Sequence, residues 1–537
     1  CLGNGTAIKA MANGNFCATC FFGCGAGLTG LAGFSPDADE NLVAGTDAGG
    51  NFNGSTACNN ILLGKESGKC VTVGFNNIFL GRDIGSVNAV TGNYNVVFGC
   101  QSGKCLSSGS NNVLIGKRAG THGVQGCSAN VFIGHATGFC NNGNDNIFLG
   151  YSSGKSSSTV NNNTGGCNVS IGYEAGCCLT GGDTNILIGK KTANCLSSAS
   201  SNIFIGKEVA CQCAITGNAN IILGERAGKY LNSGTCNVFL GGYSGHNFCS
   251  GAHNVMMGWR AGFCSDDNNY NVFLGHRAGN TTTGSYNTLM GSDAGLFLES
   301  GDFNIAIGYY ALRGTENDAN GTRNIAIGCN SGSFVSDGQR NIFLGNNAGN
   351  NITTGCCNVI IGQGHQAASA TGDNQFSIGI DSNIWICGNS SYNVNIPNTL
   401  SKGGGSFKID HPHPTKTNTH FLVHSFIEGP KMDLIYRGRV DLVAGTATVN
   451  IDEVSNMTEG TFVLLNRDIQ SFTTNETGWS AVKSSVSGNL LTITAQDSES
   501  TDTISWMVIG ERQDDKIKSL DMTDDNGNLI VEPLKDS

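Results

Sequence analysis

Most of the chain repeats one short pattern of hydrophobic and polar positions. In most repeats an Asn is followed by three apolar residues, a Gly, two variable residues, a small Ala or Ser and a second Gly. The pattern recurs from Asn41 to Asn358 at intervals close to 17 residues. This period is too short for two-helix repeats and is typical of coils built from short strands and tight turns. We therefore predict an all-β fold, with a β-solenoid of about twenty coils over residues 1–380.

The repeated Asn marks the register of the coils. A Gly stands four positions after each of them, where a corner of the coil needs a positive φ angle or a close backbone approach. Longer intervals, such as Asn146 to Asn168, hold polar insertions that we expect to bulge from one coil. We expect the Asn residues to form a structural ladder, which includes Asn60, Asn77, Asn95, Asn112, Asn130, Asn202, Asn237, Asn271 and Asn341.

Proline is absent from the repeats. The chain has six prolines, and none lies between Pro36 and Pro397. Because Pro has no backbone N–H, this is expected where nearly every residue donates a hydrogen bond to a neighbouring coil. At a spacing of about 4.8 Å, about twenty coils make a shaft on the order of 95 Å long.

The apolar triplet predicts two apolar faces. Alternate side chains of a strand point in opposite directions, so the first and third residues share one face and the middle residue takes the other. A lone solenoid needs only its inner face to be apolar, so we expect other chains to cover the large middle residues in an intertwined or parallel homotrimer. A wider single-chain coil that folds both faces inward is the alternative. The predicted inter-chain stripe is Phe79, Phe132, Phe148, Phe204, Phe239, Phe273 and Phe343.

Composition favours an extracellular or virion structure over an enzyme. The chain has 79 Gly among 537 residues and only 13% charged residues, as in a turn-rich repeat. Its net charge of −11 disfavours nucleic-acid binding. No segment is long and apolar enough to insert into a membrane. We expect a secretory signal to be either absent or already removed, and we expect no cofactor.

The 23 cysteines recur at repeat positions, often ten residues after the Asn or directly before it. Three interpretations remain open. The thiols could be free and pack as small apolar side chains, or they could form disulfides between coils or chains. Metal binding is the third, although the pairs Cys17/Cys20 and Cys211/Cys213 lack a second pair at zinc-site spacing.

Charged and aromatic residues gather at positions five and six after the repeated Asn. Mixed charges at such positions indicate a solvated edge. A glycan-binding ridge is the alternative, with Trp259, Tyr309 and Tyr310 as the residues that would stack on sugars.

The pattern changes near residue 380. Residues 381–405 form a transition that ends in a flexible Gly-rich joint, and residues 406–513 predict a small β-rich domain followed by an acidic tail at 514–537. Its predicted strands are ATVNI, FVLLN, LLTITAQ and SWMVIGER. His411 and His413 could hold a metal ion around a trimer axis, although a proline-fixed turn also explains them. We predict no catalytic residues, and the ligand-binding residues remain unassigned.

Several phrases carry a resemblance to known proteins. GCNVSIGYEAG, NVFLGHRAG and TTGCCNVIIG resemble the repeats of tail-fibre and virion structural proteins from marine cyanophages, and more distantly the heads of trimeric autotransporter adhesins. SFKIDHP, HFLVHSFIEGP, IYRGRVDL, LNRDI and SWMVIGERQD resemble a C-terminal module that follows phage fibre shafts.

The resemblance implies a non-enzymatic trimeric fibre of a phage virion. Its partners would be other copies of itself, other virion proteins and a glycan or protein receptor on the host surface. A cellular surface adhesin is the alternative. A polysaccharide-depolymerising tailspike is a further one, but it needs a pair of carboxylates across a groove, and no such pair stands out.

Overall fold

The computed structural model divides the chain into two units, residues 1–397 and 398–537. It describes residues 36–397 except 54–55, 124, 157–162, 317–318 and 392, then residues 431–513, and residues 524–531 except 527. Elsewhere it describes only the backbone of two antiparallel strand pairs. These strands are β1 (Lys9–Ala10), β2 (Phe16–Cys17), β25 (Ser406–Asp410) and β26 (Phe421–Ser425).

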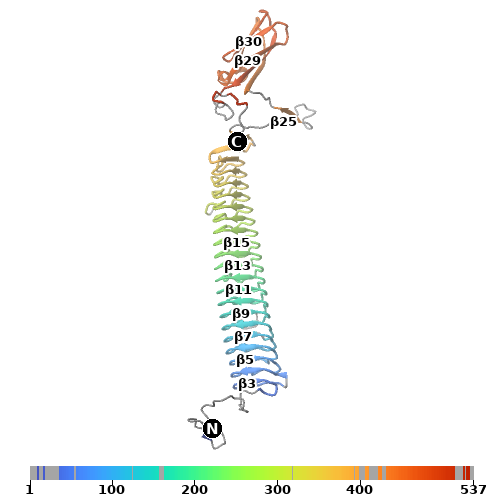
Figure 1. The fold of residues 1–537 in the computed structure, drawn as a ribbon, viewed down its shortest axis with the longest axis vertical. Helices are drawn as coiled ribbons and strands as arrows, with labels where there is room; N and C mark the ends of the chain where they lie inside the picture. The colour runs from blue at the N-terminus through green and yellow to red at the C-terminus, as the bar shows by residue number, and fades with distance from the viewer. Residues whose placement is uncertain are drawn as a thin grey trace. The chain divides into compact units, whose positions relative to one another are not determined.

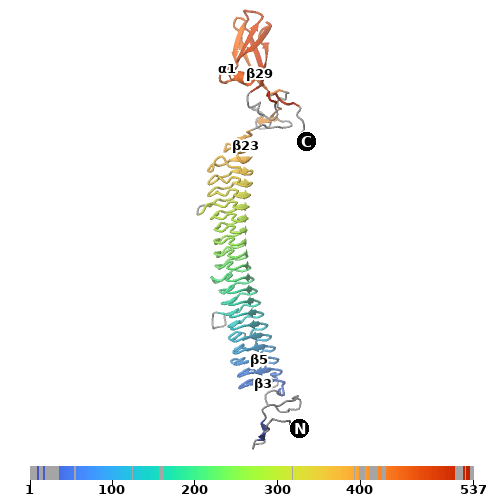
Figure 2. The ribbon, with the colours of Figure 1, turned by 60° about the vertical axis from the view of Figure 1, so that its left-hand side comes forward.

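The first unit is a β-solenoid (Figures 1 and 2). Each coil contributes one three-residue strand, which pairs in parallel with the strands of the coils before and after it. Residues at the same repeat position lie opposite one another, so the predicted solenoid is confirmed, with nineteen such strands. They are β3 (Leu42–Ala44), β4 (Ile61–Leu63), β5 (Ile78–Leu80), β6 (Val96–Phe98), β7 (Val113–Ile115), β8 (Val131–Ile133), β9 (Ile147–Leu149), β10 (Val169–Ile171), β11 (Ile186–Ile188), β12 (Ile203–Ile205), β13 (Ile221–Leu223), β14 (Val238–Leu240), β15 (Val255–Met257), β16 (Val272–Leu274), β17 (Thr288–Met290), β18 (Ile305–Ile307), β19 (Ile325–Ile327), β20 (Ile342–Leu344) and β21 (Val359–Ile361).

The middle residue of each triplet faces the inside of its own coil. The assignment of the Phe column to an inter-chain stripe is therefore wrong, because these side chains are fully buried within a single chain and belong to its continuous core. The first and third residues face outward, so the coil does not fold both faces inward either. The corrected residues are Phe79, Phe132, Phe148, Phe204, Phe239, Phe273 and Phe343.

The second Gly of the repeat explains why a ring fits inside such a narrow coil. A Cβ atom added at Gly154 would lie 2.3 Å from the ring of Phe148, and one at Gly349 would lie 2.3 Å from the ring of Phe343. This turn therefore leaves little room for a side chain when Phe fills the interior, and in the coil of Phe204 the small Ala210 takes the position. The facing turn thus leaves room for the ring, and in some coils a second large side chain also enters the core, as Phe248 does with its ring 5.0 Å from that of Phe239.

The predicted Asn ladder is present, and its members are fully buried. Asn220 shows the pattern: its backbone N–H donates to Oδ1 of Asn202 at 2.9 Å, and its Nδ2 donates to the carbonyl of Gly234 at 2.8 Å. Its own Oδ1 accepts from the backbone N–H of Asn237 at 3.0 Å. Each Asn therefore links its coil to both neighbours and satisfies backbone groups that burial would otherwise leave unpaired.

The ladder also crosses the longer intervals. The backbone N–H of Asn168 donates to Oδ1 of Asn146 at 2.9 Å across 22 residues, and that of Asn324 reaches Asn304 at 2.9 Å across 20. The insertions therefore leave the register of the coils intact.

A short antiparallel cap continues the solenoid sheet beyond the repeats. β22 (Phe376–Ile380) pairs in parallel with β21, whereas β23 (Asn383–Gly388) and β24 (Val394–Asn395) add antiparallel strands. His365 is buried beneath this cap, with Nε2 2.6 Å from Oγ of Ser377 and Nδ1 2.9 Å from the carbonyl oxygen of Asp381. The first unit thus extends to Pro397, which lies within the transition predicted at residues 381–405.

The described part of the second unit is a β module with two three-stranded antiparallel sheets, β27–β32–β29 and β28–β31–β30. One core joins them, in which Leu491 and Ile493 of β31 meet Ile504, Trp506 and Val508 of β32. The β-rich prediction is confirmed. The elements are β27 (Asp433–Asp441), β28 (Thr446–Asn450), α1 (Ile451–Val454), α2 (Thr461–Leu465), β29 (Asn466–Asn475), β30 (Val482–Ser487), β31 (Leu490–Ala495) and β32 (Thr503–Arg512).

The strand predicted for FVLLN is wrong, because this segment forms most of α2. The carboxylate of Asp452 accepts the backbone N–H groups of Gly460 at 2.7 Å and Phe462 at 2.6 Å, which satisfies donors at the start of the helix. Phe462 is fully buried. Tertiary packing and this cap therefore outweigh the local preference of Phe and Val for strands.

Candidate functional site

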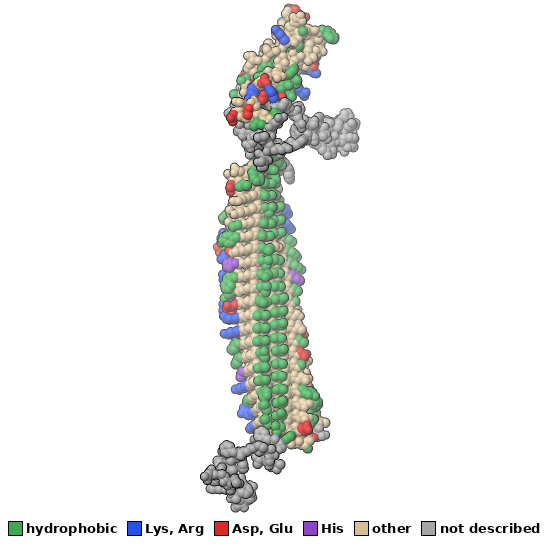
Figure 3. All heavy atoms as spheres, viewed as in Figure 1, with side chains coloured by type: hydrophobic (Ala, Val, Ile, Leu, Met, Phe, Trp, Pro, Cys, Tyr) green, Lys and Arg blue, Asp and Glu red, His purple; other side chains and the backbone are tan. Residues whose placement is uncertain are grey.

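Two adjacent columns of apolar side chains run along one face of the shaft (Figure 3). The first and third residues of strands β3–β21 form them, and we call these positions the outer columns. Within these strands the outer columns contain no charged residue, and Thr288 is their one polar member. Their side chains are partly exposed, reaching 41% for Ile147 and Ile327. The sequence therefore predicted an outward apolar stripe correctly but assigned it to the wrong positions of the triplet.

The edge beside the outer columns is charged, and many of its charges are paired between coils. Arg226 contacts Glu208 at 2.8 Å, and Lys207 contacts Glu225 at 2.9 Å. Exposed pairs of this kind contribute little to stability, typically about 0–1 kcal/mol each. Their arrangement agrees with the predicted solvated edge.

Aromatic residues on the surface of the shaft stack mostly on one another. The rings of Tyr270 and Tyr286 lie 5.0 Å apart and nearly parallel, and Phe303 continues the stack at 4.8 Å. Stacked rings hide the flat faces that a sugar would need, so this column stabilises the shaft and is poorly suited to glycan binding.

The predicted sugar-stacking residues do not form one platform. The ring centres of Tyr309 and Tyr310, which follow β18, lie 4.0 Å apart. Trp259 follows β15, three strands earlier, and its ring packs beside Tyr243. Arg313 lies 5.0 Å from the ring of Tyr310. The structure does not bring these aromatic side chains together into a ridge.

The cysteines within the described residues carry no disulfide. Cys105, Cys127, Cys140 and Cys211 are buried, and the others are partly or fully exposed, so only some of them pack as apolar core residues. Sγ of Cys177 lies 3.9 Å from Sγ of Cys178. Burial and this neighbouring thiol raise the pKa of Cys177 to about 12, which keeps it protonated and unreactive at neutral pH.

The structure gives no support for a metal site at the cysteine pairs or at His411 and His413. His411 and His413 lie outside the described residues. Within the described ranges, no group of three or more His, Cys, Asp or Glu side chains is placed to hold a metal ion.

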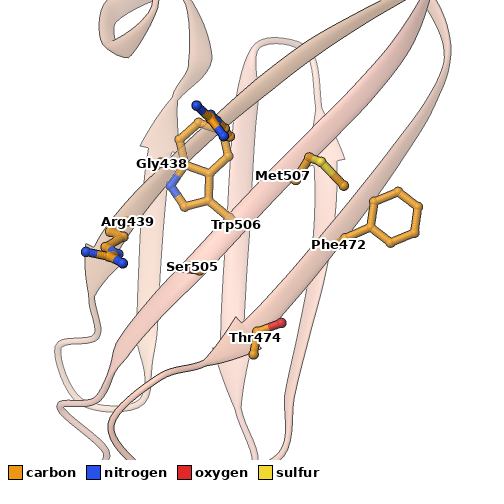
Figure 4. A pocket seen from close by; sticks show the side chains of 8 residues that line it. Gly438, Arg439, Phe472, Thr474, Ser505, Trp506 and Met507 are labelled. Atoms are coloured by element: carbon orange, nitrogen blue, oxygen red, sulfur yellow. The ribbon is translucent and has the colours of Figure 1, made fainter. Parts of the chain in front are cut away.

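The module carries a groove on the outer face of the sheet β27–β32–β29 (Figure 4). Its volume is about 650 Å³, and residues from all three strands line it. Strand alternation places Ser505 and Met507 on this face, while Trp506 turns into the core. The ring of Phe472 is 48% exposed in the groove. Sequence reasoning did not assign this surface.

Two arginines supply the charge of the groove. Nε of Arg439 contacts the carboxylate of Glu476 at 3.0 Å. Arg437 is exposed, and no carboxylate of the described residues pairs with it. A free guanidinium near an exposed aromatic ring can hold an anionic group while the ring packs on an apolar surface of the same ligand.

The chain matches no known protein family, and comparisons with curated proteins and with solved structures also give no match. No helix among the residues described above has the length and apolarity to span a bilayer. A functional assignment therefore rests on the fold, on the outer columns of the shaft and on the groove of the module.

Proposed function

We propose that this chain is the structural subunit of a phage virion fibre, in which the solenoid is the shaft and the C-terminal module serves attachment to the host surface. The observation that carries this proposal is the unbroken ladder of nineteen parallel strands. At about 4.8 Å per strand, they extend on the order of 85 Å. One repeated unit stacked in a single register produces length and rigidity, which are the properties of a spacer.

The fibre would be a homotrimer anchored through other virion proteins, and its receptor would be a glycan or protein of the host surface. Three modules on one fibre would bind a repeated surface ligand with far higher avidity than one module. The proposed role is non-enzymatic, and the phage assignment rests on the resemblance of the repeats and of the C-terminal phrases.

The decisive test locates the protein and its binding partner together. Gold-labelled antibodies against the intact chain should decorate tail structures of phage particles from the source of the gene, and labelled protein should bind cells of a marine cyanobacterial panel. Labelling confined to cell envelopes would instead favour the surface adhesin. Release of oligosaccharide from purified host polysaccharide would contradict the non-enzymatic role.

The groove of the module is the surface that we expect to contact the receptor. Arg437→Ala and Phe472→Ala should each weaken cell binding by about tenfold or more, because charged and aromatic anchors dominate recognition surfaces. Flow cytometry with labelled full-length protein measures this. Lys483→Ala is the matched control, since Lys483 is an exposed cation on the other sheet. If all three variants bind like the unchanged protein, the groove is not the attachment site.

A further inference from the structure

The size of the outer columns sets them apart from ordinary surface. Nineteen strands at about 4.8 Å, with an apolar width of about 10 Å, present on the order of 900 Å². The largest apolar patch of a typical monomer covers about 300–600 Å², whereas each partner of a standard interface buries about 800 Å². The face is therefore large enough for a stable interface and too large to remain in water without cost.

The spacing of the outer columns restricts what can cover them. Their side chains repeat once per coil in strict register, as the pairing of Ile186 with Ile203 and of Ile203 with Ile221 shows. A partner that covers the whole face must present apolar side chains at the same spacing over the same length, without charge. The outer columns of another copy of this chain have that spacing, length and composition.

A parallel arrangement of the copies would bring the two outer columns together. In a cyclic assembly around an axis parallel to the shaft, the first column of each chain lies beside the third column of its neighbour. The first column is mostly Val and Ile, and the third is mostly Leu, Ile and Met. Val or Ile would then face Leu, Ile or Met at most levels, and every coil would meet its own equivalent.

We propose that copies of this chain associate through the outer columns, parallel and in register, so that the first and third triplet positions form the inter-chain core. This inference deepens the proposed function, because it names the surface that assembles the fibre. The two proposals can nevertheless be distinguished. A monomeric protein that still binds host cells would contradict the interface and leave the attachment role intact.

Carboxylates placed in the first column test the interface. Ile186→Asp, Ile203→Asp and Ile221→Asp together should dissociate the assembly, raising its dissociation constant by more than about a hundredfold, because the interface would bury unpaired charges. In reducing buffer, the unchanged protein should have the mass of two or more chains of 55.7 kDa each. Light scattering coupled to size exclusion gives the mass, and circular dichroism checks that the coils remain folded.

The matched control places the same charges in the same coils but off the outer columns. Thr184, Ser201 and Ala219 are exposed residues with positive φ angles, a conformation that Asp tolerates. Their triple Asp variant should remain assembled. A monomeric unchanged protein, or a test variant that assembles as well as this control, would overturn the proposal. A dimeric mass would support the interface and contradict the trimer.

Two measurements on the unchanged chain keep the proposal testable if the Asp variant fails to fold. Met257 and Met290 of the third column are 40% and 37% exposed in a single chain. In the assembly they should resist hydrogen peroxide at least about tenfold better than in the denatured chain. Oxidation at the denatured rate would overturn the interface, and gold tags on the C-termini at both ends of one rod would overturn the parallel direction.

Discussion

Replacing Gly224 with Ala should destabilise the middle of the shaft by about 3–5 kcal/mol. Gly224 is the corner glycine after β13, with a φ angle of 139°. A Cβ atom at this position would lie 2.4 Å from the carbonyl oxygen of Gly241 in the next coil. The obstacle is backbone that is held in the ladder on both sides, so it cannot move aside as a flexible side chain could.

Native-state hydrogen exchange is the appropriate measurement for Gly224→Ala, because a solenoid need not unfold in a single two-state step. The opening free energy of amides in the coils around β13 and β14 should fall, while amides in distant coils change little. Gly181→Ala is the control, since Gly181 lacks a positive φ angle and its added Cβ would meet only Oγ1 of Thr164 at 3.7 Å. Equal losses in the two variants would show that close coil contact is not what requires the corner glycine.

The sequence was sufficient to predict the solenoid, its register and its Asn ladder, because each follows from spacing. A period of 17 residues determines how much chain enters a coil, and the lack of proline agrees with continuous hydrogen bonding between coils. Neither observation depends on which way a side chain points. These features therefore survive any error about the inner and outer faces.

The orientation of the triplet was predicted wrongly, although the sequence contains a signal for it. Strand alternation separates the middle residue from its neighbours but does not say which side is inside. The decisive signal is the small residue and second Gly that follow most corners. They leave space opposite the middle residue, as the contact of Gly154 with the ring of Phe148 shows. A large middle residue on the strand and small residues on the facing turn together indicate which side of the triplet is the interior.

The groove of the module could not be derived from single strands. Arg437, Phe472 and Met507 belong to three strands that are separated along the chain and meet only through the order β27–β32–β29. Strand alternation predicts that each faces outward, but antiparallel pairing across long connections decides which of them become neighbours. The helix α2 was missed for a related reason, because its cap comes from Asp452, ten residues before Phe462.

The second large effect concerns the ladder itself: Asn220→Ala should cost about 3–5 kcal/mol. The substitution removes the acceptor of the Asn237 backbone N–H and the donor to the Gly234 carbonyl, as well as the side-chain bonds to Asn202 and Asn237. All of these groups lie in the fully buried column, where water cannot replace the lost partner. Leaving a buried polar group unpaired typically costs about 1–3 kcal/mol.

Asn247→Ala is the control for this substitution, because Asn247 lies on an exposed turn of the next coil. Its side chain contacts only Nδ1 of His246 at 2.6 Å and the sulfur of Cys264 at 3.4 Å. Hydrogen exchange should show loss of protection in the coils on both sides of Asn220 in the Asn220→Ala variant and almost none in the Asn247→Ala variant. An Asn220→Asp variant refines the result: it retains an acceptor for the Asn237 N–H but loses the donor to Gly234 and buries a charge, so it should be at least as destabilised as the Ala variant. If Asn220→Asp were as stable as the unchanged chain, the donor half of the ladder would contribute nothing, and the Asn at each repeat would need another explanation.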